Sequence, residues 1–276
     1  IFCLPSFKSM DYIHGYSDTE QVRLIQQAEY WREKLILKDL NYQAGEKLLE
    51  IGCGAGAVLG ILGQAFPGLK LAGIDLEPKQ IDYAQKHLNN LDISNADLRV
   101  GDAAKLPWQD DYFDHIYAIW FLEHLPNPLQ ALQAVKRVTK PGGTITVTET
   151  DYRTILITPE SADYRYLIDS LCELLLQAQG KPYIGQSLAT LLVQAGFERV
   201  KNQPFPVHYA YSLDSQELRG FIDYVDSWLA PTVEQAITQL GKDSQRLQAG
   251  LDWFRSISDR HDGAVSATIY RASAIN

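Results

Sequence analysis

The most informative segment of the chain is Leu48-Leu49-Glu50-Ile51-Gly52-Cys53-Gly54-Ala55-Gly56. It predicts a short buried strand that ends in a glycine turn and opens a helix. Because Gly52, Gly54 and Gly56 have no Cβ atoms, the turn can adopt positive φ and come within van der Waals distance of a ligand. The following helix presents unpaired N–H groups and a partial positive charge. The stretch therefore indicates a site for a nucleotide-like cofactor.

The glycine spacing leaves more than one class of protein open. Gly52-x-Gly54-x-x-Ala57 also fits the dinucleotide fingerprint, which tolerates alanine at its third position. Asp75 lies roughly twenty residues further on, where that fingerprint places an acid that binds ribose. A nicotinamide-dependent oxidoreductase is thus an alternative at this point, as is a tight turn that binds no ligand.

Composition and charge narrow the function classes. The 276 residues carry a net charge of -9, with Lys and Arg dispersed along the chain, which argues against a nucleic-acid partner. The cysteines, three in number, form no CxxC pair, which argues for a reducing compartment and against a disulfide framework or a zinc site. No apolar run is long enough to span a membrane. We expect a cytoplasmic monomer or homodimer with no membrane partner and no metal.

Strand and helix patterns alternate from residue 47 to about residue 150. The expected strands are residues 47–51, 69–75, 97–101, 113–120 and 144–149, and the expected helices are residues 57–65, 78–91 and 128–138. This alternation predicts a parallel sheet with crossover helices on both of its faces.

The rest of the chain adds two strands and several helices. Further elements are expected as a helix at 186–196, a strand at 197–200 that continues at 207–210, and a last strand at 265–272. The helical pattern between these last strands, roughly residues 215–260, is too long for a simple connection and predicts a helical cap. An amphipathic helix over residues 18–40 is placed to fold over the cofactor mouth.

These elements define one fold and four segments. The fold class is α/β, a Rossmann-like, doubly wound, seven-stranded and mostly parallel sheet with an N-terminal lid helix and a helical insertion between the last two strands. The predicted segments are a lid at 1–44, a cofactor-binding core at 45–212, a cap insertion at 213–263 and a final core strand at 264–276.

Four segments together carry a family resemblance. They are Leu48–Gly56, Gly73–Pro78, Gly101–Trp108, and Phe113–Leu125 followed by Val138–Gly143. Over residues 45–150 the chain resembles the class I S-adenosylmethionine-dependent methyltransferases, and among them the small-molecule branch that includes the ubiquinone-biosynthesis methyltransferases. A nicotinamide enzyme has no reason to carry the last two segments at these distances.

The resemblance implies S-adenosyl-L-methionine as cofactor and S-adenosyl-L-homocysteine as product. It implies that Asp75 binds the ribose hydroxyls, that Asp102 and the Ala103 N–H bind the adenine, and that Glu50 orients the glycine loop. Helix capping is the alternative role of both aspartates. Leu76 is expected to pack on the adenine and Gln80 to add a polar contact. The cofactor-binding residues expected are Tyr16, Glu50, Gly52, Cys53, Gly54, Gly56, Asp75, Leu76, Gln80, Asp102, Ala103, Ile119 and Trp120.

The methyl acceptor is harder to predict, because methyl transfer requires no particular catalytic side chain. A base, if one is used, would be a His, Glu, Asp or Tyr near the cleft. The candidate catalytic residues are His14, His124 and Glu149, and the candidate substrate-binding residues are Tyr12, Glu123, Asp151, Tyr152 and Tyr183. The implied reaction is methyl transfer to an N or O atom of a small molecule, aromatic or amine-containing, in secondary metabolism or quinone biosynthesis. A cofactor-binding module without catalysis is the further alternative.

Overall fold

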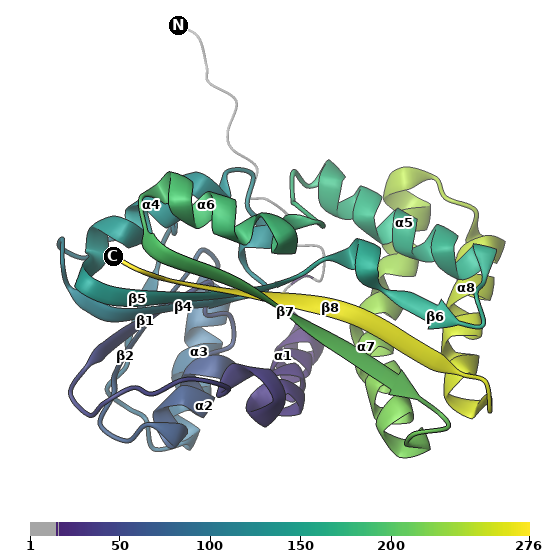
Figure 1. Ribbon diagram of the computed structural model, residues 1–276, viewed down its shortest axis with the longest axis horizontal. Helices are drawn as coiled ribbons and strands as arrows, with labels where there is room; N and C mark the ends of the chain where they lie inside the picture. Colours follow the sequence, from purple (N-terminus) through teal and green to yellow (C-terminus); the bar gives the residue numbers. More distant parts are fainter. Residues whose placement is uncertain (1–14, 16) are drawn as a thin grey trace, which may run out of the picture.

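A mixed sheet of eight strands runs through the centre of the structure, a computed structural model that describes residue 15 and residues 17–276 (Figure 1). The strand order is β3-β2-β1-β4-β5-β8-β6, with β7 paired to β8. The strands are β1 (Lys47–Ile51), β2 (Lys70–Asp75), β3 (Asp97–Val100), β4 (Phe113–Ile119), β5 (Thr139–Thr150), β6 (Leu156–Thr158), β7 (Glu198–Ala210) and β8 (Ala264–Ile275).

Strands β1 to β5 pair in parallel, and the chain reverses direction only at β8. β8 runs antiparallel to β5, β6 and β7. The apolar strand β1 is covered on both faces, with Leu48, Leu49 and Ile51 fully buried, as expected of a central parallel strand. The predicted Rossmann-like, mostly parallel sheet is confirmed. The three-residue strand β6 is an addition that the sequence pattern did not predict.

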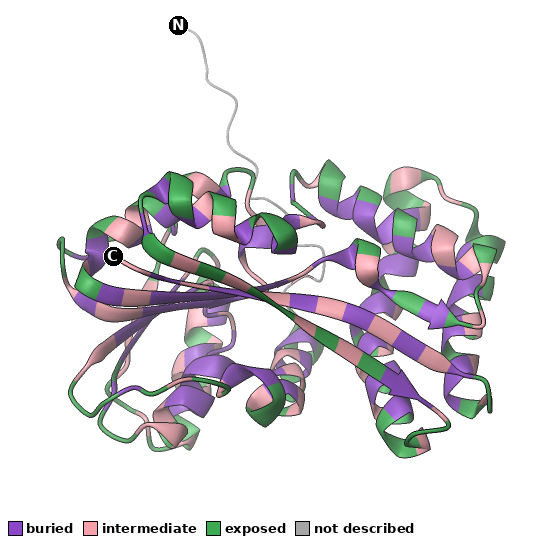
Figure 2. Ribbon diagram, in the orientation of Figure 1, coloured by how far each residue is buried: buried purple, intermediate pink, exposed green. Residues whose placement is uncertain are grey.

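Helices cover both faces of the sheet (Figure 1). They are α1 (Asp18–Trp31), α2 (Ala57–Ala65), α3 (Pro78–Asn90), α4 (Pro128–Val138), α5 (Ala162–Gln177), α6 (Leu188–Ala195), α7 (Ser215–Leu240) and α8 (Ser244–Ser256). In Figure 1, α4 and α6 lie on one face, and α1, α2 and α3 on the other. The buried side chains fall into two clusters divided by the sheet. Figure 2 colours the ribbon by burial, with buried residues in purple along the strands of the sheet.

Local sequence signals explain where the helices begin. Pro78 occupies the first turn of α3, and the Glu77 carboxylate accepts the Lys79 N–H at 3.3 Å. The Asp214 carboxylate caps α7 by accepting the N–H groups of Gln216 and Glu217 at 2.9 and 3.0 Å. These caps satisfy N–H groups that have no partner inside the helix.

Three helices, α5, α7 and α8, pack against one another beside the end of the sheet that holds β6, and we call them the helical cap (Figure 1). The helical pattern predicted at 215–260 corresponds to two helices, α7 and α8, which belong to this cap. Residues 154–182 carry no element in the prediction, yet they hold β6 and α5. The N-terminal helix is shorter than the predicted 18–40, because α1 ends at Trp31 and a five-residue π-helical segment follows, Arg32–Ile36.

The helices also bear on membrane association. Across the described part of the chain, no helix combines the length and the apolar character needed to cross a bilayer.

Candidate functional site

One cavity joins the carboxyl ends of β1, β2, β4 and β5 to the helices above them. Ligands bind at this edge in open α/β sheets, because loops of opposite direction leave a crevice there. The strand side is lined by the glycine turn, by the residues that follow β2 and by residues 119–125 after β4. The opposite side is lined by α1, α5 and α7. The cavity therefore has a wall of loops and a wall of helices.

The glycine turn shapes the first wall. Gly52, Gly54 and Gly56 all have positive φ, at +67°, +46° and +73°. A Cβ on Gly52 would lie 2.0 Å from Cδ2 of Phe121, so this glycine lets the Phe121 ring cover the turn. Gly54 has open space beside it, with Leu24 Cδ1 as the nearest atom at 3.7 Å. The turn is thus packed closely at Gly52 and open to the cavity at Gly54.

Asp75 organises the turn from the end of β2. Its Oδ2 accepts the Gly54 N–H at 2.9 Å, and its Oδ1 accepts the Glu77 N–H at 3.0 Å. Burial raises the pKa of this carboxyl, although both N–H donors act to lower it. A carboxylate has about four acceptor positions, so two donors leave room for the hydroxyls of a ligand.

Two further polar side chains line this end of the cavity without complete hydrogen bonding. Among the described residues, Glu50 Oε2 and Gln80 Oε1 are buried and have no hydrogen-bond partner. Burial raises the pKa of Glu50 well above its ordinary value. Unpartnered buried oxygens are costly, and donors on a bound ligand would satisfy them.

Of the residues predicted to contact adenine, some line the cavity and others do not. Leu76 lines the cavity and is 56% exposed, an unusual exposure for a leucine, which leaves its side chain available to a planar ring. Asp102 and Ala103 lie outside the cavity lining. Asp102 Oδ1 accepts the Ala104 N–H at 2.8 Å within a turn, and no helix begins there. Gly56 also lies behind the lining and contacts Ala84 of α3.

The turn after β4 is held in a strained conformation. Trp120 has φ of +47°, and its indole N–H donates to Thr150 Oγ1 at 3.0 Å. Glu149 is buried behind this turn, where its Oε1 accepts the N–H groups of Phe121 and Leu122 at 3.0 and 2.6 Å. Glu149 does not line the cavity, and its position is that of a residue that orients the turn.

Glu123, His124 and Tyr152, which follow β4 and β5, form a cluster in the cavity lining. The Tyr152 hydroxyl donates to Glu123 Oε1 at 3.4 Å, and His124 Nε2 lies 3.5 Å from the same oxygen. Burial raises the pKa of Glu123 to about 8, so its carboxyl is mostly protonated at neutral pH. Burial and the positive charge of Arg23 lower the pKa of His124 to about 4, so its imidazole is neutral. Neutral His124 is a candidate proton acceptor, and Glu123 becomes one when its carboxyl ionises.

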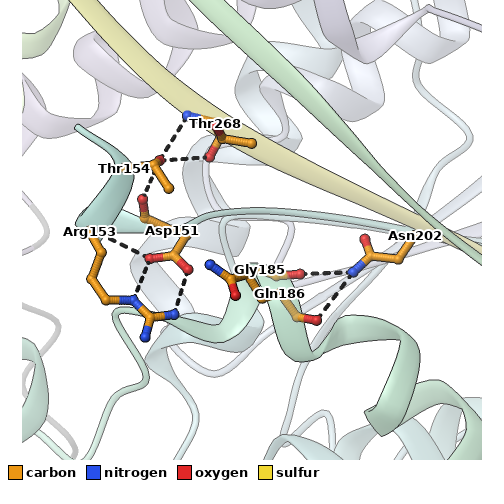
Figure 3. Close-up of polar contacts among 7 residues, drawn as sticks. All are labelled: Asp151, Arg153, Thr154, Gly185, Gln186, Asn202 and Thr268. Atoms are coloured by element: carbon orange, nitrogen blue, oxygen red, sulfur yellow. Dashed lines mark hydrogen bonds and ion pairs between the residues drawn. The ribbon is translucent and has the colours of Figure 1, made fainter. Parts of the chain in front are cut away.

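Asp151 and Tyr183 lie outside the cavity lining. Figure 3 shows the polar contacts of Asp151 with its neighbours. The Asp151 carboxylate is fully buried and accepts the Nε and Nη2 groups of Arg153 at 3.1 and 2.7 Å. The same guanidinium stacks over the Tyr183 ring, 4.6 Å from its centroid. Asn202 of β7 donates nearby to the Gly185 carbonyl at 3.1 Å. This cluster joins the loop after β5 to the residues before α6.

Helices supply residues that the sequence prediction did not assign to the site. From α1 come Arg23, Leu24, Gln27 and Ala28, from the region of α5 come Leu175, Ala178 and Gly180, and from α7 come Tyr224 and Trp228. Glu20 accepts Arg23 Nε and Nη2 at 2.6 Å each. The apolar spacing of 162–177 was the available signal for α5, but no local signal shows which face of a helix meets a cavity.

Tyr12, His14 and Tyr16 lie outside the described residues. Within the portion that the structure describes, His, Cys, Asp and Glu side chains nowhere gather in a group of three or more that could hold a metal ion.

Part of the chain is similar to known methyltransferases. A methyltransferase domain family matches residues 49–147. The demethylmenaquinone methyltransferase of Oceanobacillus iheyensis is 28% identical over 204 residues, which are 69% of this chain and 85% of the relative. That of Halalkalibacterium halodurans is 32% identical over 141 residues, which are 51% of this chain and 57% of the relative.

A solved structure shows the same fold over nearly the whole chain. Phosphoethanolamine N-methyltransferase 2 of Haemonchus contortus, in complex with phosphomonomethylethanolamine and S-adenosylhomocysteine, superposes with a TM-score of 0.65 at 16% identity. The alignment covers 99% of this chain and 61% of that one. This chain spans about half the length of several curated relatives that it matches.

Residues 49–147 form a methyltransferase domain of the class I S-adenosylmethionine-dependent type. Within this class it has distant homology to the demethylmenaquinone methyltransferases. Membership decides between the two enzyme classes that the glycine spacing left open, in favour of a methyltransferase over a nicotinamide-dependent oxidoreductase.

Proposed function

We propose that this chain transfers a methyl group from S-adenosylmethionine to a nitrogen or oxygen atom of a small molecule. The observation that carries the proposal is the single cavity that runs from the glycine turn and Asp75 to the cluster of Glu123, His124 and Tyr152. A cofactor bound along the strand ends would thus share one enclosed space with an acceptor bound under the helices.

The residues at the strand ends suit this cofactor. Asp75 has acceptor positions for ribose hydroxyls, and the exposed Leu76 offers a surface to adenine. The unpartnered oxygens of Glu50 and Gln80 are acceptors for the ammonium group at the amino-acid end. When bound, the cofactor supplies a methyl group that its sulfonium already activates.

The chain's own task is then to position the acceptor and to exclude water. Trp120 and Phe121 come from the strained turn after β4, and Tyr224 and Trp228 come from α7; all four line the cavity. Glu149 keeps that turn in place through its two N–H contacts. Neutral His124, and Glu123 once its carboxyl is ionised, are the groups placed to receive a proton from the acceptor.

Calorimetric titration with S-adenosylhomocysteine and with reduced nicotinamide dinucleotides tests the cofactor assignment. We expect micromolar binding of S-adenosylhomocysteine, weakened at least tenfold, about 1.4 kcal/mol, by Asp75→Ala. Asp82→Ala, an exposed aspartate on α3, is the matched control and should bind normally. Binding that is indifferent to Asp75, or that prefers the dinucleotide, would overturn the proposal. Methyl transfer to any acceptor in a broad panel separates an enzyme from a non-catalytic module.

A further inference from the structure

The Glu123 carboxyl is incompletely hydrogen-bonded on the acceptor side of the cavity. Its side chain is almost fully buried, yet it lines the cavity. Oε1 has the Tyr152 hydroxyl and His124 Nε2 beside it, while Oε2 has no hydrogen-bond partner among the described residues. An unpartnered buried oxygen destabilises the fold, so its retention at a cavity wall points to a ligand that donates to it.

Aromatic rings surround the same part of the cavity. Tyr152 and Trp228 meet edge to face with ring centroids 6.1 Å apart, and Tyr224 lines the cavity one helical turn before Trp228. Trp120 faces the cavity from the opposite wall. A cation within about 6 Å of such ring faces is stabilised by their quadrupoles, and more strongly where water is excluded. A carboxyl among aromatic rings is the environment that an ammonium group prefers.

The titratable side chains around Glu123 define the charge of this part of the cavity. Burial raises the pKa of Cys172 to about 11 and that of Tyr224 to about 12, so both are neutral near pH 7. The titratable and charged groups around Glu123 and His124 are Arg23 on α1, Glu149 on β5, Tyr152 after β5, Cys172 on α5 and Tyr224 on α7. The cation of this set, Arg23, is already paired with the Glu20 carboxylate.

We propose that the acceptor is a small amine, which Glu123 binds as an ammonium ion against Tyr152, Tyr224 and Trp228 and then deprotonates. The inference rests on the proposed methyl transfer and names its substrate class. Because a neighbouring cation favours the ionised carboxyl, ammonium binding displaces the Glu123 proton to solvent. The carboxylate next accepts a proton from the ammonium, so an N–H bond breaks and an O–H bond forms. The freed lone pair forms the N–CH₃ bond as the S–CH₃ bond breaks and its electrons pass to sulfur.

Choline and its neutral isostere 3,3-dimethylbutan-1-ol test the binding step without any reaction. We expect choline to bind at least tenfold more tightly at pH 7.5, in the presence of saturating S-adenosylhomocysteine. Calorimetry in Tris and in phosphate, which differ in ionisation enthalpy, should show that choline binding releases up to one proton and that the isostere releases none. Choline affinity should also rise with pH between 6.5 and 8.5.

Glu123→Gln isolates the carboxyl while keeping the shape of the side chain. We expect it to weaken choline binding at least fivefold and to abolish the proton release, with affinities for the isostere and for S-adenosylhomocysteine unchanged within twofold. Glu173→Gln, at a carboxylate outside the cavity that pairs with Lys242, is the matched control and should behave as wild type.

Benzylamine and p-cresol, which are similar in shape, complete the test as acceptors. Methyl transfer to benzylamine, lost in Glu123→Gln, is the expected result. Transfer to p-cresol alone, equal binding of choline and its isostere, or indifference of choline to Glu123→Gln would each overturn the amine assignment and leave the methyltransferase proposal intact. Failure to bind S-adenosylhomocysteine would instead overturn the proposed function itself.

Discussion

The cofactor wall and the acceptor wall of the cavity are built in different ways. The cofactor wall takes the glycine turn, Asp75 and Gln80 from one continuous stretch, residues 50–80, and uses backbone N–H groups as much as side chains. The acceptor wall takes its side chains from α1, the turn after β4, the loop after β5, α5 and α7. The cofactor wall is therefore local in the sequence, while the acceptor wall is assembled from segments that are distant along the chain.

The two walls meet at the turn after β4. Phe121 of this turn covers Gly52 of the cofactor wall, and Glu123 two residues later belongs to the acceptor wall. Glu149 holds the turn through two backbone N–H groups. If the walls are as separate as their construction suggests, variants in each should affect one ligand and spare the other.

Gly52→Ala should have the largest effect, and on the cofactor wall. The added Cβ would lie 2.0 Å from Phe121 Cδ2, and φ of +67° would strain any residue with a side chain. We expect S-adenosylhomocysteine affinity to fall at least 100-fold, about 2.7 kcal/mol, by calorimetry. Gly142→Ala is the control, since Gly142 has φ of +79° but nothing within 4 Å of its added Cβ. Equal losses in both variants would mean that backbone strain, rather than contact with Phe121, is decisive.

Gly180→Ala is the corresponding change in the acceptor wall. Its Cβ would lie 2.7 Å from the Glu123 carbonyl oxygen and 3.0 Å from that of Leu175, and neither backbone atom can rotate away. We expect choline affinity to fall about tenfold, about 1.4 kcal/mol, with S-adenosylhomocysteine affinity within twofold of wild type.

Gly220→Ala on α7 provides the control for this change. Gly220 lies in the helical cap with open space around it, so alanine there should leave both affinities unchanged and raise stability by roughly 0.5 kcal/mol. A matching loss of cofactor affinity in Gly180→Ala would show that the two walls are coupled.

The pH dependence of stability should show the smallest effect. Because the pKa of Glu123 rises to about 8 on folding, the folded chain keeps a proton that the unfolded chain loses above its ordinary pKa. Stability from this group is therefore complete at low pH and is lost as pH rises through 8. Between pH 6 and 9 we expect the Tm of wild type to fall further than that of Glu123→Gln, by a difference on the order of 5 °C.

His124 contributes in the opposite direction. Its pKa falls to about 4 on folding, so the unfolded chain binds a proton first and stability is lost as pH decreases from about 6.5 toward 4. Parallel Tm profiles of wild type and Glu123→Gln above pH 6 would contradict the buried, protonated state assigned to Glu123.

How far the sequence predicts the molecule differs between the two walls. The order of elements from 47 to 150 follows from apolar strands, prolines at helix starts and glycine turns, all of which act over a few residues. The same stretch supplies Glu50, Gly54, Asp75 and Gln80, which line the cavity, because the residues that end parallel strands meet at one edge of the sheet. Helix α5 was not predicted, although Ser161 caps it and its apolar residues recur at helical spacing.

Local sequence is enough to predict the α/β class, the glycine turn and Asp75, the acid that binds the turn, since each depends on neighbours within about 25 residues. Tertiary structure alone decided what each acidic side chain does. Glu123 lines the cavity with an unpartnered oxygen, Glu149 binds backbone N–H groups behind it, and Asp151 is paired with Arg153. The three carboxyls look equivalent in the sequence, and they differ because burial and hydrogen-bond partners come from helices and strands that are distant along the chain.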